Sequence, residues 1–98
     1  MTSGSIRFHP LAADEAEAAR VWYLARNPTV AAAFSRELIA AIEIIAEAPS
    51  RWPRLYDRFR RYLLHRFPFS VVYLEQKDGI EVIAVAHHRR KPGYWKQR

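Results

Sequence analysis

The sequence predicts an α+β fold, in which a helical hairpin packs on a small antiparallel sheet in the order β-α-α-β-β-β. Three observations lead to this prediction. Apolar residues recur at helical spacing in residues 28–48. Shorter runs of β-branched and aromatic residues follow in the second half, separated by turn-forming residues. The 98-residue chain has no cysteine, so one domain with a single core and no disulfide is expected.

The first two elements are predicted before residue 27. Residues 6–9 alternate apolar and polar side chains, which is typical of a short strand. Pro10 suits the first turn of a helix, and acidic residues such as Glu15 complement the positive end of a helix dipole. A helix is therefore expected over residues 11–26.

The second helix, over residues 28–48, is the clearest element of the sequence. Asn27 is a good N-cap and Pro28 a good first helical residue. Because the link between the two helices is so short, they should form an antiparallel hairpin. The predicted apolar stripe of the second helix consists of Val30, Phe34, Leu38, Ala41, Ile45 and Ala48.

The second half of the chain predicts three strands, over residues 58–67, 69–75 and 80–87. Residues 49–55 are expected to form a connecting loop. Gly79 supplies a positive φ for the turn before the last strand. That strand is apolar throughout and needs cover on both faces, so it should lie centrally in the sheet. The three strands should form a meander, and the first strand of the chain should join the sheet edge.

Charge is distributed unevenly along the chain. Residues 1–49 hold four Lys or Arg and six Asp or Glu, a net charge of −2. Residues 50–98 hold twelve Lys or Arg and four Asp or Glu, a net charge of +8. A half this basic favours a polyanionic or acidic partner, such as a nucleic acid, an anionic membrane or an acidic protein. Residues 88–98 form its basic tail.

Several classes of protein and site are not expected. No apolar run approaches the roughly 20 residues of a membrane span. Residues 1–5 lack the pattern of a signal peptide. His87 and His88 are neighbours on a strand end and point to opposite sides, so they cannot easily hold one metal ion. We expect a cytoplasmic protein with no cofactor, no metal and no membrane partner.

Three sequence features then point to a known family. Arg61-Tyr62-Leu63 leads to Phe69-Ser70-Val71-Val72-Tyr73, an apolar run leads to His87-His88-Arg89-Arg90, and the chain closes on Pro92-Gly93-Tyr94-Trp95. With this order of elements, nearly the whole chain resembles the small toxins of the RelE/ParE superfamily, from bacterial type II toxin–antitoxin modules.

The resemblance implies a growth-inhibiting toxin that a cognate antitoxin neutralises. ParE-like members poison DNA gyrase, which is the favoured interpretation. The alternative is a RelE-like, ribosome-dependent endoribonuclease that cuts messenger RNA. A third interpretation, which explains the charge but not the resemblance, is a non-enzymatic nucleic-acid-binding domain.

The catalytic residues of the alternative also follow from the resemblance. RelE-like nucleases use basic strand residues and a C-terminal tyrosine to activate the ribose hydroxyl, neutralise the phosphate and protonate the leaving oxygen. If this chain is a metal-independent ribonuclease, the resemblance implies Tyr94, His88 and Arg61 in these roles. RelE itself has an arginine where Ser70 stands here, which leaves the set incomplete.

Basic and aromatic residues of the second half are the candidates for target binding. By strand alternation, Arg60 and Arg66 share one face and Arg61 and His65 the other. Exposed aromatic residues of the tail could stack on bases or fold back onto their own sheet, and both possibilities stay open. The candidates for target or nucleic-acid binding are Arg60, Arg66, His87, Arg89, Arg90, Lys91 and Trp95, and those for antitoxin binding are Trp22, Arg58 and Arg61.

Overall fold

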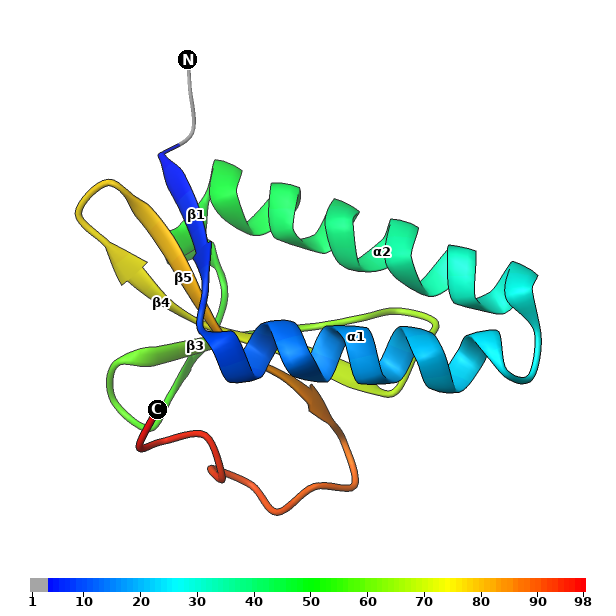
Figure 1. Ribbon diagram of the computed structural model, residues 1–98. Coiled ribbons are helices and arrows are strands. Elements are labelled where there is room, and N and C mark those ends of the chain that lie inside the picture. Colours follow the sequence, from blue (N-terminus) through cyan, green and yellow to red (C-terminus); the bar gives the residue numbers. More distant parts are fainter. Residues whose placement is uncertain (1–3) are drawn as a thin grey trace.

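The computed structural model describes residues 4–98, so residues 1–3, part of the segment without a signal-peptide pattern, lie outside the described residues. Two long helices cross one side of a small twisted sheet, and the C-terminal tail curls back beneath it (Figure 1). The elements are β1 (Ser5–Phe8), α1 (Pro10–Leu24), α2 (Pro28–Glu47), the 3₁₀ turn η1 (Pro49–Arg51), β2 (Arg54–Leu55), β3 (Phe59–Leu63), β4 (Phe69–Gln76) and β5 (Gly79–His87).

The sheet is mixed, with the strand order β1-β5-β4-β3-β2. Strands β2 to β5 pair antiparallel, whereas β1 pairs parallel with β5. The predicted helical hairpin on a small sheet and the central place of β5 are confirmed. The antiparallel meander and the place of β1 at the sheet edge are also confirmed. The direction of β1, for which the sequence made no prediction, is parallel to β5, because the two helices between β1 and the meander form a long enough crossover.

Local signals explain the helix ends. The His9 imidazole accepts a hydrogen bond from the Leu11 N–H at 3.1 Å, so His9 caps α1 rather than extending the first strand. The Asn27 side chain accepts from the Thr29 N–H at 2.9 Å and caps α2, with Pro28 in the first turn.

Two expectations about the middle of the chain are corrected. The strand expected over residues 58–67 ends at Leu63, because residues 65–68 form the turn into β4. The Glu37 carboxylate of α2 accepts from the backbone N–H groups of His65 and Arg66, which fixes this turn against the helix. The loop expected over residues 49–55 contains η1 and the short edge strand β2.

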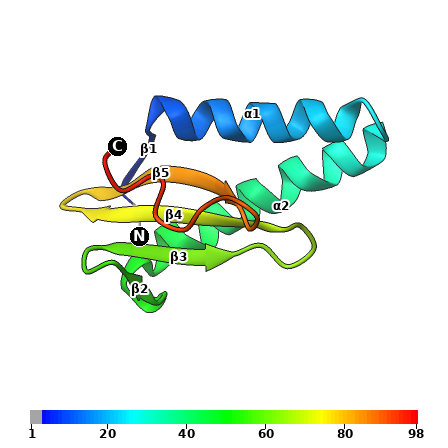
Figure 2. The same cartoon turned by 90° about the horizontal axis from the view of Figure 1, so that it is seen from below.

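Each face of the sheet buries its own apolar cluster. On the helix face, Phe34, Leu38 and Ile45 of α2 pack against Tyr73 and Val82 of the sheet. On the outer face, the smaller cluster consists of Phe59, Val72, Ile83, Ala84, Ala86 and Trp95. The tail crosses this outer face on the side opposite α2 (Figure 2), and its Trp95 is only 5% exposed. The tail is thus a third layer of the fold.

A β-bulge decides which way the end of β5 points. Val72 pairs with Ala84 and Tyr73 with Val82, so Ile83 is the extra residue. Before the bulge, Val82 faces the helices; after it, Val85 does. The bulge reverses the alternation, and it therefore directs His87 toward the helix face and His88 toward the outer face.

Candidate functional site

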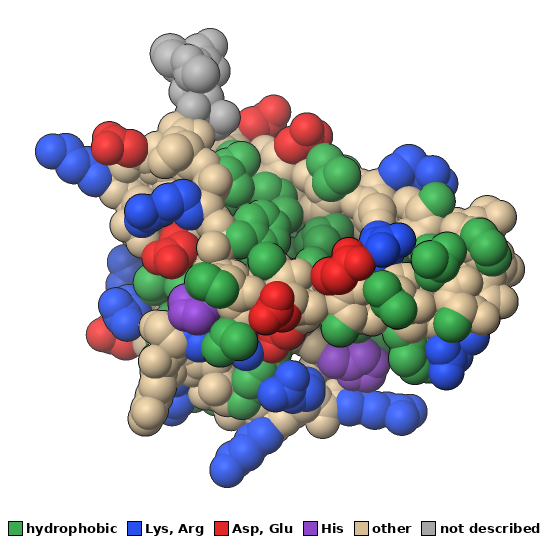
Figure 3. Space-filling view, viewed as in Figure 1, with side chains coloured by type: hydrophobic (Ala, Val, Ile, Leu, Met, Phe, Trp, Pro, Cys, Tyr) green, Lys and Arg blue, Asp and Glu red, His purple; other side chains and the backbone are tan. Residues whose placement is uncertain are grey.

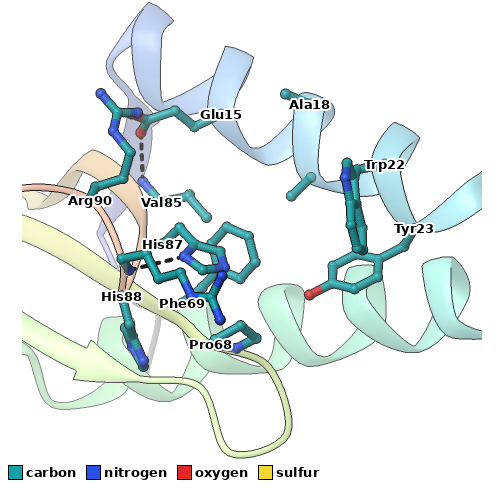
Figure 4. Close-up of a pocket in the computed structure, with 12 residues that line it drawn as sticks. Glu15, Ala18, Trp22, Tyr23, Pro68, Phe69, Val85, His87, His88 and Arg90 are labelled. Atoms are coloured by element: carbon teal, nitrogen blue, oxygen red, sulfur yellow. Dashed lines mark hydrogen bonds and ion pairs between the residues drawn. The ribbon is translucent and has the colours of Figure 1, made fainter.

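A groove between α1 and the exit of β5, here called the helix groove, is the larger of two hollows that border the basic tail. Its volume is about 800 Å³, within the range of ligand-binding sites. Figure 4 shows the α1 residues on one wall and the strand ends on the other. The lining residues are Glu15, Ala18, Ala19, Trp22, Tyr23, Pro68, Phe69, Val85, His87, His88, Arg89 and Arg90.

Aromatic rings form the apolar half of the helix groove. Trp22 is 54% exposed and packs edge-on against Tyr23, with ring centroids 5.2 Å apart. His87 packs edge-on against Phe69 at 5.0 Å. A partner that covers the Trp22 ring would remove a large apolar area from water, so Trp22 is suited to contact a partner.

The exit of β5 supplies the basic rim of the groove. Basic side chains project along the lower edge of Figure 3, near the tail. Arg89 and Arg90 are exposed, and the backbone N–H of Arg89 donates to Nδ1 of His87 at 3.0 Å. Burial and the neighbouring Arg89 charge lower the pKa of His87, so the imidazole favours its neutral form near pH 7.

One carboxylate ties the tail to the first helix. Glu15 of α1 accepts two hydrogen bonds from the Arg98 guanidinium, at 2.9 and 2.8 Å, and one from the Tyr94 hydroxyl at 2.7 Å. It also accepts from the Val85 N–H of β5 at 3.0 Å, and Arg90 lies 3.7 Å away. We call Glu15, Tyr94 and Arg98 the Glu15 clasp.

The electrostatics of the clasp favour a charged Glu15 and a neutral Tyr94. Burial raises the pKa of Glu15, but the hydrogen bonds from Arg98, Tyr94 and the Val85 N–H outweigh it and hold the pKa below its usual value. Burial, together with the hydrogen bond to Glu15, raises the pKa of Tyr94. The phenol therefore stays protonated and donates to the carboxylate.

A second, smaller hollow of about 200 Å³ lies on the outer face and is here called the outer hollow. Its floor includes Val72, Ala86 and Trp95, and Arg61 and His88 stand beside it. The His88 Nε2 lies 3.0 Å from the hydroxyl oxygen of Ser70. The outer hollow thus combines an apolar floor with cationic and hydrogen-bonding groups.

Comparisons with known proteins place this architecture. Residues 6–92 match the family model described as the ParE toxin of the type II toxin–antitoxin system parDE. The chain belongs to the ParE toxin family. The predicted RelE/ParE-superfamily toxin is confirmed, and the ParE side is favoured over the RelE side.

A solved structure from the chromosomal ParDE toxin–antitoxin system of P. aeruginosa has a similar fold. Its TM-score is 0.76 at 17% sequence identity, over 87% of this chain and 96% of that chain. At 17% sequence identity, this similarity shows that the two chains share a fold and shows nothing further about function. A comparison with curated proteins finds no match.

The three residues expected to act together in RNA cleavage are separated in this ParE-family chain. Arg61 and His88 both line the outer hollow. Tyr94 does not line it, and its hydroxyl donates to Glu15 of α1. The structure therefore brings two of the three together and turns the reactive atom of the third toward another partner.

The residues expected to bind the target divide into exposed and engaged groups. Arg89, Arg90 and Lys91 are exposed, and Arg66 is exposed beside Glu37. Arg60 is engaged internally, because its guanidinium donates to Glu75 at 2.9 Å and to the Trp52 carbonyl at 2.6 Å.

Two further expected binding residues are partly or wholly covered. His87 is half-buried in the helix groove. Trp95 is buried under the sheet. Of the two possibilities left open by the sequence, this ring therefore folds back onto its own sheet.

The residues expected to bind the antitoxin are also divided. Trp22 lies in the helix groove. Arg61 lies in the outer hollow, on the opposite face of the sheet. Arg58 lies in the turn before β3, where its guanidinium stands 5.2 Å from the centroid of the Phe59 ring. The three residues do not form one surface.

Several residues of these sites were not singled out from the sequence. The sequence predicts only that Glu15 complements a helix dipole, and it predicts no functional role for Arg98, Tyr23 or Phe69. Residues 15 and 98 are 83 positions apart, so no local spacing connects them. The sequence feature that points to this pair is the opposite net charge of the two halves of the chain, because a carboxylate in the acidic half is a natural partner for a cation in the basic tail.

The described residues contain no group of three or more His, Cys, Asp or Glu side chains arranged to hold a metal ion. Among these residues, no helix has the length and apolar character required to cross a membrane.

Proposed function

We propose that this ParE-family toxin arrests growth by binding DNA gyrase and not by cutting messenger RNA. The supporting observation is the position of Tyr94. In RNA cleavage, the group that protonates the leaving oxygen must reach the scissile phosphate. The Tyr94 hydroxyl instead donates to Glu15, and burial together with this bond raises its pKa.

The exposed basic residues at the exit of β5 supply the target-binding surface in this proposal. Arg89 and Lys91 are exposed, and Pro92 restricts the backbone that carries them. Basic side chains on a restrained segment can bind an acidic protein surface, or DNA held by a protein, and such binding requires no catalytic step. The place of action would be the cytoplasm, where gyrase works on DNA.

We also propose that a cognate antitoxin silences the toxin by laying an apolar and acidic segment into the helix groove. Trp22, Tyr23 and Phe69 offer apolar area to such a segment, and Arg89 and Arg90 offer partners for carboxylates. The groove is large enough for several side chains of one helix or extended strand. The expected segment is therefore amphipathic, with its acidic residues toward the β5 exit.

Induced expression without antitoxin tests the choice of target. A gyrase poison should induce the DNA-damage response and stabilise cleaved DNA in a purified gyrase assay, while messages stay intact. A ribosome-dependent nuclease should leave cuts in messenger RNA within minutes. Intact gyrase activity together with cut messages would refute the proposal.

Tyr94→Phe provides a sharper comparison. It removes the hydroxyl that a nuclease needs but keeps the ring, so growth arrest should persist if the target is gyrase. The folded fraction of the variant must be measured, because the hydroxyl also bonds Glu15. Loss of growth arrest in a fully folded Tyr94→Phe protein would favour the nuclease.

A further inference from the structure

The outward side of helix α2 carries a row of exposed side chains. The buried side of the same helix packs on the sheet and includes Phe34, Leu38 and Ile45. The outward positions recur every three or four residues, so they form one stripe along the helix. This α2 stripe consists of Ala32, Arg36, Ile39, Ala40, Glu43 and Glu47, all of them exposed.

The middle of the α2 stripe is apolar. Ile39 is 59% exposed, more than any other large apolar side chain within residues 4–98. Ala40 beside it is small, which allows another helix to approach closely. A single exposed isoleucine is common on protein surfaces, so its meaning depends on the charges around it.

Opposite charges flank this apolar middle symmetrically. Arg36 precedes Ile39 by three residues, and Glu43 follows Ala40 by three residues. Within residues 4–98, neither Arg36 nor Glu43 belongs to an ion pair. Basic atoms stand over the middle of α2 and acidic atoms over its C-terminal end (Figure 3). Both charges are therefore available to a partner.

The acidic residues of the stripe are poorly placed for α2 on its own. Glu47 lies in the last turn, where the helix dipole disfavours negative charge, and this turn has no basic residue. A second helix that runs antiparallel to α2 brings its positive N-terminal half beside these carboxylates. The charge pattern of the stripe thus fits an antiparallel helix.

A second copy of the chain supplies such a helix. With a two-fold axis between Ile39 and Ala40, Arg36 of each copy stands opposite Glu43 of the other copy. Ile39 of each copy then stands opposite Ala40 of the other. Because a two-fold interface repeats each contact, two ion pairs form on either side of one apolar centre. The α2 stripe is therefore complementary to itself.

We propose that this toxin forms a two-fold dimer through the α2 stripe. The basic tail crosses the face of the sheet opposite α2 (Figure 2), so the two basic surfaces stay apart in such a dimer. No residue of α2 lines the helix groove, so this groove stays open to an antitoxin in each copy. The dimer does not depend on gyrase being the target.

Sedimentation equilibrium of the purified, antitoxin-free protein at low salt measures the dimer. Because one pair of helices is a small interface, the dissociation constant should be micromolar, about 10–100 µM. Arg36→Glu should weaken the dimer about tenfold or more, since it replaces two attractive pairs with two repulsive ones. Glu43→Arg should have the same effect for the same reason.

Mixing the two charge variants provides the decisive comparison. Two chains of either variant repel each other across the axis, but one Arg36→Glu chain and one Glu43→Arg chain are complementary at both contacts. The equimolar mixture should therefore form dimers with about the affinity of the natural chain. The double variant Arg36→Glu with Glu43→Arg should also dimerise, because it exchanges the charges within each pair.

Matched controls separate the stripe from the rest of the surface. Ile39→Ala should weaken the dimer about tenfold, whereas Ile44→Ala, on an exposed isoleucine of α2 outside the stripe, should leave it unchanged. Arg20→Glu makes the same charge reversal on α1 and should also leave it unchanged. Circular dichroism of each variant shows whether it is folded.

Three results overturn the proposal. The first is a natural chain that stays monomeric at every concentration up to about 1 mM. The second is a dimer that Arg36→Glu does not weaken, and the third is an equimolar mixture of the two charge variants that stays monomeric. If the natural chain is monomeric and Arg36→Glu instead weakens binding of the cognate antitoxin, the α2 stripe belongs to the antitoxin site and the dimer is refuted.

Discussion

Glu15 joins three parts of the chain that are far apart in sequence: helix α1, strand β5 and the last residues of the tail. Its side chain is 14% exposed, and that of Arg98 is 11% exposed. Removing one partner of such a pair leaves the other charge covered and without compensation, which costs more than losing a surface pair. Glu15 is therefore expected to be the most sensitive carboxylate of the molecule.

The substitution Glu15→Gln should lower the free energy of unfolding by about 3 kcal/mol. The amide keeps the size of the side chain but loses the charge that holds Arg98. Urea unfolding at pH 7 measures the change. Glu17→Gln is the control on the same helix, because Glu17 pairs with Arg20 at the exposed surface and should leave the midpoint nearly unchanged. Equal effects of the two substitutions would contradict the role given to Glu15.

Acid should weaken the same clasp. The pKa of Glu15 is lower in the folded protein than in the unfolded chain, so its contribution to stability is complete above the unfolded value of about 4.5 and is lost as pH falls through the folded value. The difference in stability between the natural chain and Glu15→Gln should therefore shrink as pH falls below about 4.5. Urea midpoints of both proteins measured across this pH range provide the test, and a constant difference would refute it.

At the scale of elements, the tail acts as a covering layer and not as a free arm. Trp95 packs under the sheet with Phe59 and Ile83. Its indole N–H has no hydrogen-bond partner among residues 4–98, so the contribution of this side chain is that of apolar packing. Because β5 is apolar on both faces, removing the tail would expose the outer cluster to water.

Trp95→Ala should lower the free energy of unfolding by about 3–5 kcal/mol, the range found for large side chains removed from a core. Trp22→Ala is a matched control, since the same ring is half-exposed on α1 and its loss should cost less than about 1 kcal/mol. In an antitoxin-binding assay the order should reverse, with Trp22→Ala losing affinity while remaining folded. A stable Trp95→Ala protein would show that the tail does not complete the core.

The elements that the sequence predicts well are those whose signals are local. Asn27 and Pro28 mark the start of α2, and the apolar stripe that includes Phe34 and Ile45 is buried as its spacing predicts. The apolar character of β5 likewise predicts cover on both faces. These features depend on neighbours within a few residues, which periodicity can detect.

The features that the sequence does not predict depend on contacts between distant segments. The bulge at Ile83 arises from pairing with β4 and decides that the His87 ring packs on Phe69 of the helix face, whereas the His88 ring lies beside Ser70 on the outer face. The alternation of side chains along β3 does not predict that the Arg60 guanidinium donates hydrogen bonds to Glu75 and to the Trp52 carbonyl. The candidate site is therefore predictable as a region, the basic end of the chain, but not as a set of side-chain directions.

At the scale of the whole molecule, the two hollows extend to different faces of one sheet and meet at the exit of β5, where His87, His88 and Arg90 line both. Arg90 lines the helix groove and the outer hollow, and it also lies 3.7 Å from Glu15. An acidic segment in the helix groove would compete with Glu15 for Arg90. Binding of an antitoxin can thereby bias the position of the tail.

The uneven charge of the chain should make antitoxin association sensitive to salt. The chain has a net charge of +6, and its basic half carries the excess, so an acidic antitoxin is steered toward the exit of β5. The association rate should fall about tenfold between roughly 0.05 and 0.5 M salt, while the dissociation rate changes little, because screening acts mainly on the long-range encounter. Stopped-flow mixing with the cognate antitoxin, the short acidic protein expected from a neighbouring reading frame, measures both rates.

Two double variants locate the steering charge. Arg89→Gln with Arg90→Gln should slow association and flatten its salt dependence, since both residues border the helix groove. Arg54→Gln with Arg58→Gln removes the same charge at the β2 edge, the sheet edge opposite β1, and should change the rate much less. Because the net charge of the two double variants is equal, any difference between them reports position alone. If the β2-edge variant slows association more, the antitoxin approaches the other side of the sheet and the helix groove is not its docking site.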